Sequence, residues 1–129
     1  MHPEKMRMKK ILLIDDEEDF RYFVKKNLEA KGNFEVEVYS DDIDIIKEVR
    51  RLRPNLILLD IKMPKRDGSD IALELKRHKD TQEIPLVFLT ALVSEEETQK
   101  KGNSIGGEYF IAKPVRMSEL INTINRFAL

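Results

Sequence analysis

The most informative residue in the sequence is Asp60, which directly follows the apolar run of residues 56–59. Such a run is typical of a buried strand, so Asp60 should lie at the carboxyl edge of a sheet, where ligands bind in open α/β folds. Further polar residues follow apolar runs in the same way: Asp15 and Asp16 after residues 11–14, Thr90 after residues 86–89, and Lys113 just beyond residues 109–111. We therefore expect these side chains to gather at one edge of one sheet.

Asp15, Asp16 and Asp60 would lie close together if their strands are neighbours. Like charges at short separation raise at least one of the pKa values, and a hard divalent cation with oxygen ligands relieves the repulsion. Mg²⁺ suits this donor set, because it keeps coordination positions open for phosphate oxygens. Lys113 would supply an ammonium group to another phosphoryl oxygen, and Thr90 a hydroxyl. The set predicts phosphoryl transfer by positioning and charge neutralisation, with Asp60 as the nucleophile.

The composition indicates one soluble globular domain and excludes several other classes of protein. The chain has 129 residues, 41% of them hydrophobic and 36% charged, which is enough to bury a core. No apolar run approaches the roughly 18 residues of a membrane span, and the basic start lacks the long apolar segment of a signal peptide. The absence of cysteine excludes disulfides and zinc-thiolate sites and favours the cytoplasm. A net charge of -1 gives no electrostatic case for direct binding of nucleic acid.

Strand-like and helix-like segments alternate five times along the chain. This pattern is typical of βαβ units and predicts an α/β fold with a parallel sheet covered by helices on both faces. Four of the strands are nearly continuous apolar runs, whereas residues 34–39 alternate strictly between apolar and polar side chains. Because alternation indicates a strand with one wetter face, we place residues 34–39 at an edge of the sheet.

Apolar residues at helical spacing predict four amphipathic helices, and a fifth segment is different. The first helix should stop near Gly32, the second before Pro54, and the third should begin at Asp67-Gly68. The segment after Ser94 has a capping pattern but no apolar stripe, and Gly102 interrupts it, so we expect it to be the softest helix. The apolar stripes are Phe20, Phe23, Val24 and Leu28; Ile43, Ile45, Ile46, Val49 and Leu52; Ile71, Ala72 and Leu75; and Leu120, Ile121, Ile124 and Phe127.

The order of the polar residues resembles the receiver domain of two-component response regulators. An Asp pair follows the first strand, a single Asp the third, a Thr the fourth and a Lys-Pro pair the fifth. The stretches LLIDDEEDF, LILLDIKMPKRDG, VFLTA and YFIAKP are each similar to the family's. The likeness covers residues 9–129 and leaves residues 1–8 as a flexible tail. It implies a flavodoxin-like, doubly wound, five-stranded parallel sheet of order 2-1-3-4-5 with five helices.

The resemblance also implies a role for each carboxylate. Asp60 would accept a phosphoryl group from a sensor histidine kinase or a phosphotransfer protein. Asp15 and Asp16 would bind Mg²⁺ together with Asp60 and the backbone carbonyl of Lys62. Taken alone, two aspartates at a helix start are as readily explained by the helix dipole.

By the same resemblance Thr90 and Phe110 would form a switch pair, and a cis peptide would join Lys113 to Pro114. Thr90 would move toward the phosphoryl oxygen and Phe110 would turn into the space, which changes the surface around the fourth helix, fifth strand and fifth helix. An aromatic residue in a strand is more often part of the core. A buried, immobile Phe110 would leave the switch to Thr90 alone.

Several positions depart from the family pattern. Gly102 and Gly107 stand where alanine is common, which should loosen the fourth helix and its junction with the last strand. Tyr109 replaces a common acidic residue and is a second candidate for the switch aromatic. Lys62 occupies the position at which phosphatases of the haloacid dehalogenase type carry an acid/base Asp. Since lysine cannot readily activate water at neutral pH, we predict a phosphoaspartate that hydrolyses slowly.

Three alternatives to a phosphorylated receiver remain. A phosphatase is disfavoured by Lys62, and a flavodoxin-like cofactor binder lacks a phosphate-binding loop after the first strand. A receiver-like scaffold that works without phosphorylation is the third. Since no effector domain follows residue 129 in this sequence, the chain is either a stand-alone receiver, monomeric or dimerising on phosphorylation, or a piece of a longer regulator.

Overall fold

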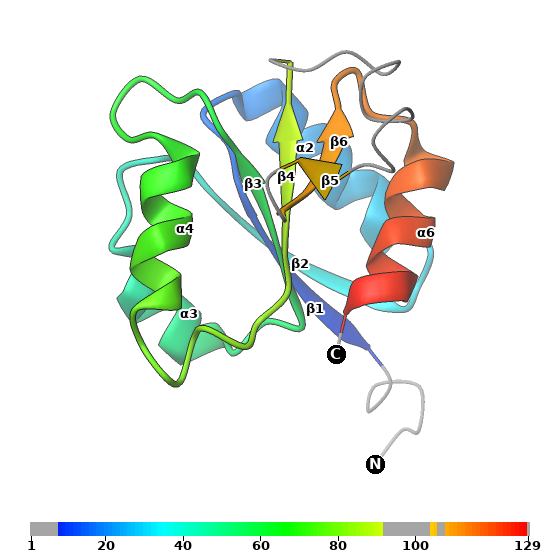
Figure 1. Cartoon of the computed structure of the whole chain (residues 1–129). Helices are drawn as coiled ribbons and strands as arrows, with labels where there is room; N and C mark the ends of the chain where they lie inside the picture. Colours follow the sequence, from blue (N-terminus) through cyan, green and yellow to red (C-terminus); the bar gives the residue numbers. More distant parts are fainter. Residues whose placement is uncertain (1–7, 92–103, 106–107, 129) are drawn as a thin grey trace.

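A computed structural model describes residues 8–91, 104–105 and 108–128 of the chain, without the side chains of residues 104, 105 and 108. The described part is a central sheet with helices on both faces (Figure 1). The expected soft helix after Ser94, including Gly102, lies outside the described residues, as do Gly107 and the expected N-terminal tail up to residue 7.

Five parallel strands form the sheet in the predicted order. The order is β2-β1-β3-β4-β6-β5, and β5 is a short strand antiparallel to β6 that was not predicted. Two residues are too few to carry a readable periodicity, which explains the omission. The strands are β1 (Lys9–Ile14), β2 (Phe34–Tyr39), β3 (Leu56–Asp60), β4 (Leu86–Thr90), β5 (Ser104–Ile105) and β6 (Glu108–Ala112).

The apolar runs form strands because helices cover both of their faces. Strands β1 and β3 lie in the interior of the sheet, and the residues of β3 are all buried. Strand β2 lies at an edge as predicted, with Phe34 and Val36 buried and Glu35 exposed. Alternation thus distinguished the edge strand from the central ones.

Four helices cover the sheet in the described part of the chain, two on each face (Figure 1). One core cluster lies between the sheet and the α3–α4 layer, and the other lies between the sheet and the α2–α6 layer. The first includes Ile57 and Phe88, and the second includes Leu58 and Leu89. The helices are α2 (Glu18–Glu29), α3 (Ile45–Leu52), α4 (Gly68–Lys76) and α6 (Met117–Phe127).

The helix ends follow the local sequence signals. Helix α3 ends at Leu52, and the next residue, Arg53, has a φ of 49° that breaks the helix directly before Pro54. Helix α4 begins after Asp67, whose side chain accepts a hydrogen bond from the backbone N–H of Ser69. Gly32 has a φ of 83°, a conformation that glycine adopts without a steric penalty, just beyond the end of α2. None of the helices in the described residues is long and apolar enough to span a bilayer.

Candidate functional site

Three carboxylates meet at the carboxyl edge of two neighbouring interior strands, β1 and β3. Strands β1 and β3 pair from Ile11–Leu56 to Ile14–Leu59, so Asp15 and Asp60 follow neighbouring positions. One oxygen from each of Asp15, Asp16 and Asp60 lies within 4.8 Å of the others. Asp15 and Asp60 are buried, whereas Asp16 is partly exposed. The cluster predicted from the sequence is therefore formed.

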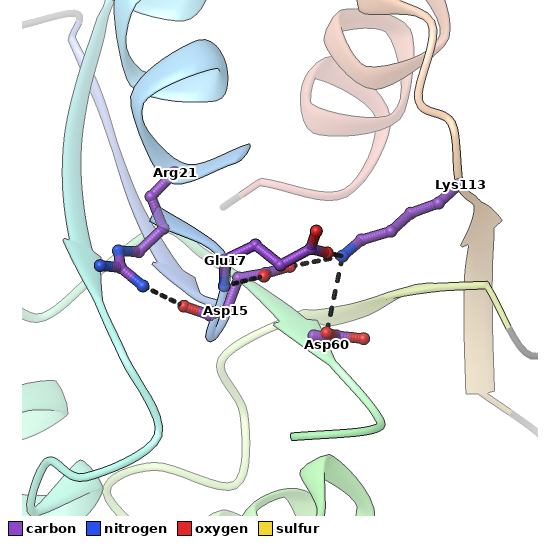
Figure 2. Close-up of polar contacts among 5 residues, drawn as sticks. All are labelled: Asp15, Glu17, Arg21, Asp60 and Lys113. Atoms are coloured by element: carbon purple, nitrogen blue, oxygen red, sulfur yellow. Dashed lines mark hydrogen bonds and ion pairs between the residues drawn. The ribbon is translucent and has the colours of Figure 1, made fainter. Parts of the chain in front are cut away.

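Lys113 reaches into this cluster from the end of β6 (Figure 2). Its Nζ donates hydrogen bonds to Asp15 Oδ2 at 2.8 Å and Glu17 Oε1 at 3.1 Å, and lies 3.5 Å from Asp60 Oδ2. The same ammonium stands 4.4 Å from the centre of the Phe20 ring. The carboxylates of Asp15, Glu17 and Asp60 thus share the ammonium group of Lys113, and Asp60 is the most distant of the three.

The backbone fixes where Lys113 lies. Its N–H donates to the carbonyl of Thr90 at 3.0 Å, which continues the β4–β6 ladder to the edge of the site. The peptide bond between Lys113 and Pro114 is cis, as the resemblance implied. Strand pairing therefore brings Thr90 and Lys113 to the same edge as Asp60.

The electrostatics of the site differ from those of an ordinary ion pair. Burial raises the pKa of Asp60 to about 6, opposed by Lys113 and reinforced by the charges of Asp15 and Asp16. Burial also raises the pKa of Asp15, although Lys113 and the N–H of Glu17 oppose it. Burial lowers the pKa of Lys113, but hydrogen bonds and charge attraction from the carboxylates raise it overall. Negative charge is in excess here, which favours binding of a cation.

An open cavity of about 230 Å³ gives access to Asp60. A small phosphodonor or a partner's side chain can approach the carboxylate through it. Residues from four strand ends line the cavity, namely Asp16, Glu17, Asp60, Lys62, Thr90, Ala91 and Lys113.

The donor set fits a hard divalent cation. Asp15, Asp16 and Asp60 each offer a carboxylate oxygen close to those of the other two, and Mg²⁺ prefers carboxylates combined with water or phosphate oxygens. Burial is the main cause of the raised pKa values of Asp15 and Asp60, and at Asp60 the charges of Asp15 and Asp16 add to it. A divalent cation at this position would stabilise the charged form of both carboxyl groups. Lys62 lines the same cavity from the loop directly after Asp60.

Thr90 and Phe110 lie on neighbouring strands. Thr90 is fully buried at the end of β4 and lines the cavity. Phe110 is 8% exposed, and its ring stacks on Phe88 with centroids 5.2 Å apart. Tyr109 packs instead on Phe127 of α6, at 4.6 Å, in the cluster on the other face of the sheet. The packing therefore associates Phe110, and not Tyr109, with the face that Phe88 occupies.

Two residues of the site were not identified from the sequence. The backbone N–H of Glu17 donates a hydrogen bond to Asp15 Oδ1 at 2.9 Å, and the Glu17 side chain accepts one from Lys113, as Asp15 does. Arg21 donates from Nη1 to the carbonyl oxygen of Asp15 at 2.7 Å, one turn into α2 (Figure 2). The spacing of Arg21 from Asp15 was a usable signal for Arg21, because the first turn of a helix faces the loop that precedes it.

Gly68 makes a close approach to the site, although the sequence indicated only the start of a helix here. A Cβ at this position would overlap the carbonyl oxygen of Asp60. The N–H of Gly68 also donates to the carbonyl of Ile61 at 2.7 Å. Helix α4 therefore starts in direct contact with the backbone of Asp60, which only glycine allows.

Comparison with known proteins identifies relatives over nearly the whole chain. Residues 11–125 match the family model of the response regulator receiver domain. The chain is 36% identical over 117 residues to the transcriptional regulatory protein RprY of Bacteroides fragilis, covering 91% of this chain and 47% of that protein. It is 34% identical over 112 residues to the alkaline phosphatase synthesis transcriptional regulatory protein PhoP of Bacillus subtilis, covering 87% and 45%. The chain thus spans about half the length of these relatives.

Solved structures show the same architecture. Chemotaxis response regulator CheY4 of Vibrio cholerae is 26% identical with a TM-score of 0.76, and 93% of this chain and 98% of that one are covered. The signal receiver domain of a signal transduction histidine kinase from Syntrophus aciditrophicus is 27% identical with a TM-score of 0.75, covering 92% and 89%. Sequence, fold and the order of the site residues agree. The chain belongs to the response regulator receiver domain family.

Proposed function

We propose that this chain accepts a phosphoryl group on Asp60 from the phosphohistidine of a sensor histidine kinase or phosphotransfer protein. The observation that carries the proposal is the placement of Asp60 in an open cavity beside Asp15, Asp16 and Lys113. A carboxylate that is buried yet reachable, with an ammonium group nearby, suits nucleophilic attack on phosphorus. Membership of the receiver family supports the same reading.

In the transfer step a carboxylate oxygen of Asp60 attacks the phosphorus atom. The new O–P bond forms as the N–P bond breaks, and the electron pair of that bond stays on the departing histidine nitrogen. A pKa of about 6 leaves Asp60 mainly ionised at neutral pH, so it is ready to attack. Mg²⁺ bound by Asp15, Asp16, Asp60 and the carbonyl of Lys62 would neutralise charge on the transferred group.

Lys113 would compensate the remaining charge. In the present arrangement it donates to Asp15 and Glu17 and is slightly more distant from Asp60. A phosphoryl group on Asp60 brings about two negative charges into the cavity, so the ammonium would be drawn toward it. Three carboxylates already hold Lys113 within reach, which reduces the reorganisation that this requires.

Thr90 would respond to phosphorylation of Asp60. Its hydroxyl would donate to a phosphoryl oxygen, and the packing of Phe110 against Phe88 would change in response. This is a shift between two packings, and the phosphoryl group stabilises one of them by its better contacts. The affected surface would include β6 and α6, through which a downstream protein partner would be bound.

A Thr90→Ala variant tests that role. It should still accept phosphate, but the ring resonances of Phe110 should respond less to phosphorylation than in the wild type. NMR of protein labelled at phenylalanine, before and after addition of acetyl phosphate and Mg²⁺, measures the response. An unchanged Phe110 response in phosphorylated Thr90→Ala would rule out this role of Thr90.

Intact-protein mass spectrometry after incubation with acetyl phosphate tests the main proposal. We expect one phosphoryl adduct in the presence of Mg²⁺ and none after chelation or in Asp60→Asn. Asp67→Asn is a matched control, because Asp67 is a partly exposed helix cap near the site that belongs to no cluster with Asp60. A folded, Mg²⁺-binding protein without any adduct would instead indicate a phosphate-independent scaffold.

A further inference from the structure

A further buried carboxylate, Asp41, lies outside the cluster around Asp60. It follows β2, which makes it another acidic residue at the carboxyl edge of the sheet, and it is only 3% exposed. It has no place in the phosphoryl transfer described above, and neither composition nor spacing singled it out. A buried carboxylate requires strong partners, so its contacts show what it does.

The partners of Asp41 are mainly backbone groups of the loop that follows Asp60. Asp41 Oδ2 accepts hydrogen bonds from the N–H of Lys65 at 2.6 Å and the N–H of Arg66 at 3.3 Å. The hydroxyl of Ser40 donates to Oδ1 at 3.2 Å. Burial alone would raise the pKa of Asp41, but these donors hold it below its ordinary value. The carboxylate is therefore a charged acceptor at neutral pH.

These bonds connect the ends of two strands, β2 and β3, that are not adjacent in the sheet. Strand β1 separates β2 from β3, so the loop after β3 has to cross the end of β1 to reach Asp41. The base of the loop is closed by the N–H of Gly68 on the carbonyl of Ile61 at 2.7 Å. Asp41 holds the part of the loop that includes Lys65 and Arg66. Met63, between Ile61 and Lys65 in the sequence, is buried in the core. Lys62 thus lies in a short segment that is fixed on both sides.

We propose that Asp41 is a positioning residue, which holds the loop of residues 61–67 so that the backbone carbonyl of Lys62 is set for a divalent cation before the cation arrives. The inference rests on the proposed function, because Lys62 is expected to bind Mg²⁺ through that carbonyl. Asp41 touches neither the cation nor the phosphoryl group. Outer partners that orient metal ligands commonly change metal affinity by about 10–100-fold.

The neighbouring residue supplies a matched control. Asp42 is exposed, and its carboxylate stands 3.8 Å from the side-chain ammonium of the same Lys65. Asp41→Asn and Asp42→Asn both remove one negative charge near Lys65. Only Asp41→Asn removes a charged acceptor from the backbone of the loop.

Titration of each purified protein with Mg²⁺ alone, followed by NMR or calorimetry, measures the effect. We expect Asp41→Asn to raise the Kd for Mg²⁺ by about tenfold and Asp42→Asn to leave it within about twofold. At saturating Mg²⁺ the rate of adduct formation with acetyl phosphate should return to near the wild-type value. A wild-type Kd in folded Asp41→Asn would overturn the inference, and so would a rate that stays low at saturation.

Hydrogen exchange in the unaltered protein provides a second measurement if Asp41→Asn fails to fold. The N–H of Lys65 should be protected without Mg²⁺, because Asp41 already accepts from it. Protection that arises only on adding Mg²⁺ would overturn the inference. A wild-type protein that neither binds Mg²⁺ nor takes up phosphate would instead refute the proposed function, whatever the state of the Lys65 amide.

Discussion

Asp60 and Asp41 are two buried carboxylates at the same edge of the sheet, and their environments act on them in opposite directions. The two residues are 5% and 3% exposed, so both are shielded from bulk solvent. The pKa of Asp60 is raised to about 6, whereas the pKa of Asp41 is lowered. Burial raises the pKa of both carboxyl groups, so the difference shows that the hydrogen-bond donors around a buried carboxylate decide whether the effect of burial is overcome, as at Asp41, or prevails, as at Asp60.

The partners determine how far the effect of burial is opposed at each carboxylate. Asp60 faces the carboxylates of Asp15 and Asp16, and Lys113, at 3.5 Å, is also shared with Asp15 and Glu17. Asp41 instead accepts from two backbone N–H groups and a hydroxyl. These donors stabilise the charged form of Asp41, and they are not shared with other carboxylates as Lys113 is. Asp60 therefore has too little positive charge around it to stabilise its charged form fully, and a bound cation would supply that charge.

The largest expected effect is an opposite change in the free energy of unfolding when each carboxylate becomes an amide. A pKa raised by about two units corresponds to at most about 3 kcal/mol of destabilisation at pH 7, so Asp60→Asn should stabilise the Mg²⁺-free protein by about 1–2 kcal/mol. Asp41→Asn should cost about 2 kcal/mol, because charged hydrogen bonds to the loop are lost. Urea unfolding at pH 7 measures both. Changes of the same sign would contradict the comparison.

The pH dependence should also separate the two residues. Folded Asp60 binds a proton up to about pH 6, while an unfolded Asp releases it near pH 4, so its contribution to stability is complete below about pH 4 and is lost as the pH rises to about 6. For Asp41, whose pKa is lowered, stability is present above about pH 4 and is lost as the pH falls further. Unfolding of wild type and both amide variants across this range, without Mg²⁺, measures the slopes. An Asp60→Asn variant with the wild-type slope between pH 4 and 6 would be the contrary result.

The sequence predicted the Asp60 region well because its signal is local. Asp15, Asp60 and Thr90 each end an apolar run, and parallel strands bring such ends together. The expected places of Asp16, Lys113 and the cis bond to Pro114 agree with the structure as well. A cluster of polar side chains at the ends of parallel strands can therefore be predicted from the amino-acid sequence alone.

The Asp41 region could not be predicted because half of each interaction is backbone. Lys65 and Arg66 act through N–H groups that every residue except proline has, and they lie 24 and 25 residues from Asp41. No residue type or spacing marks such a contact, so nothing in the sequence singled out Asp41. The same reason hid the contact of Gly68 with the carbonyl of Asp60.

A smaller effect is expected at Lys62, which lines the cavity between the two regions. Its side chain is exposed next to Asp60, so it should shield the phosphoryl group from water. Lys62→Asn should shorten the lifetime of the phosphorylated form by about tenfold or less, since an amide orients water but provides no general base. Decay of the adduct by mass spectrometry measures this, with Lys65→Asn in the same loop as control. A longer lifetime in Lys62→Asn would show that lysine does not shield.

The smallest effect is expected at Asp42, which tests whether charge alone accounts for Asp41. Its side chain is 57% exposed and 3.8 Å from the Lys65 ammonium, so Asp42→Asn should change the free energy of unfolding by less than about 0.5 kcal/mol. The small difference should vanish in about 1 M salt, because exposed pairs are screened. Urea unfolding at low and high salt compares it with Asp41→Asn. An equal loss in both variants would mean that negative charge near the loop, and not the bond to its backbone, keeps the loop in place.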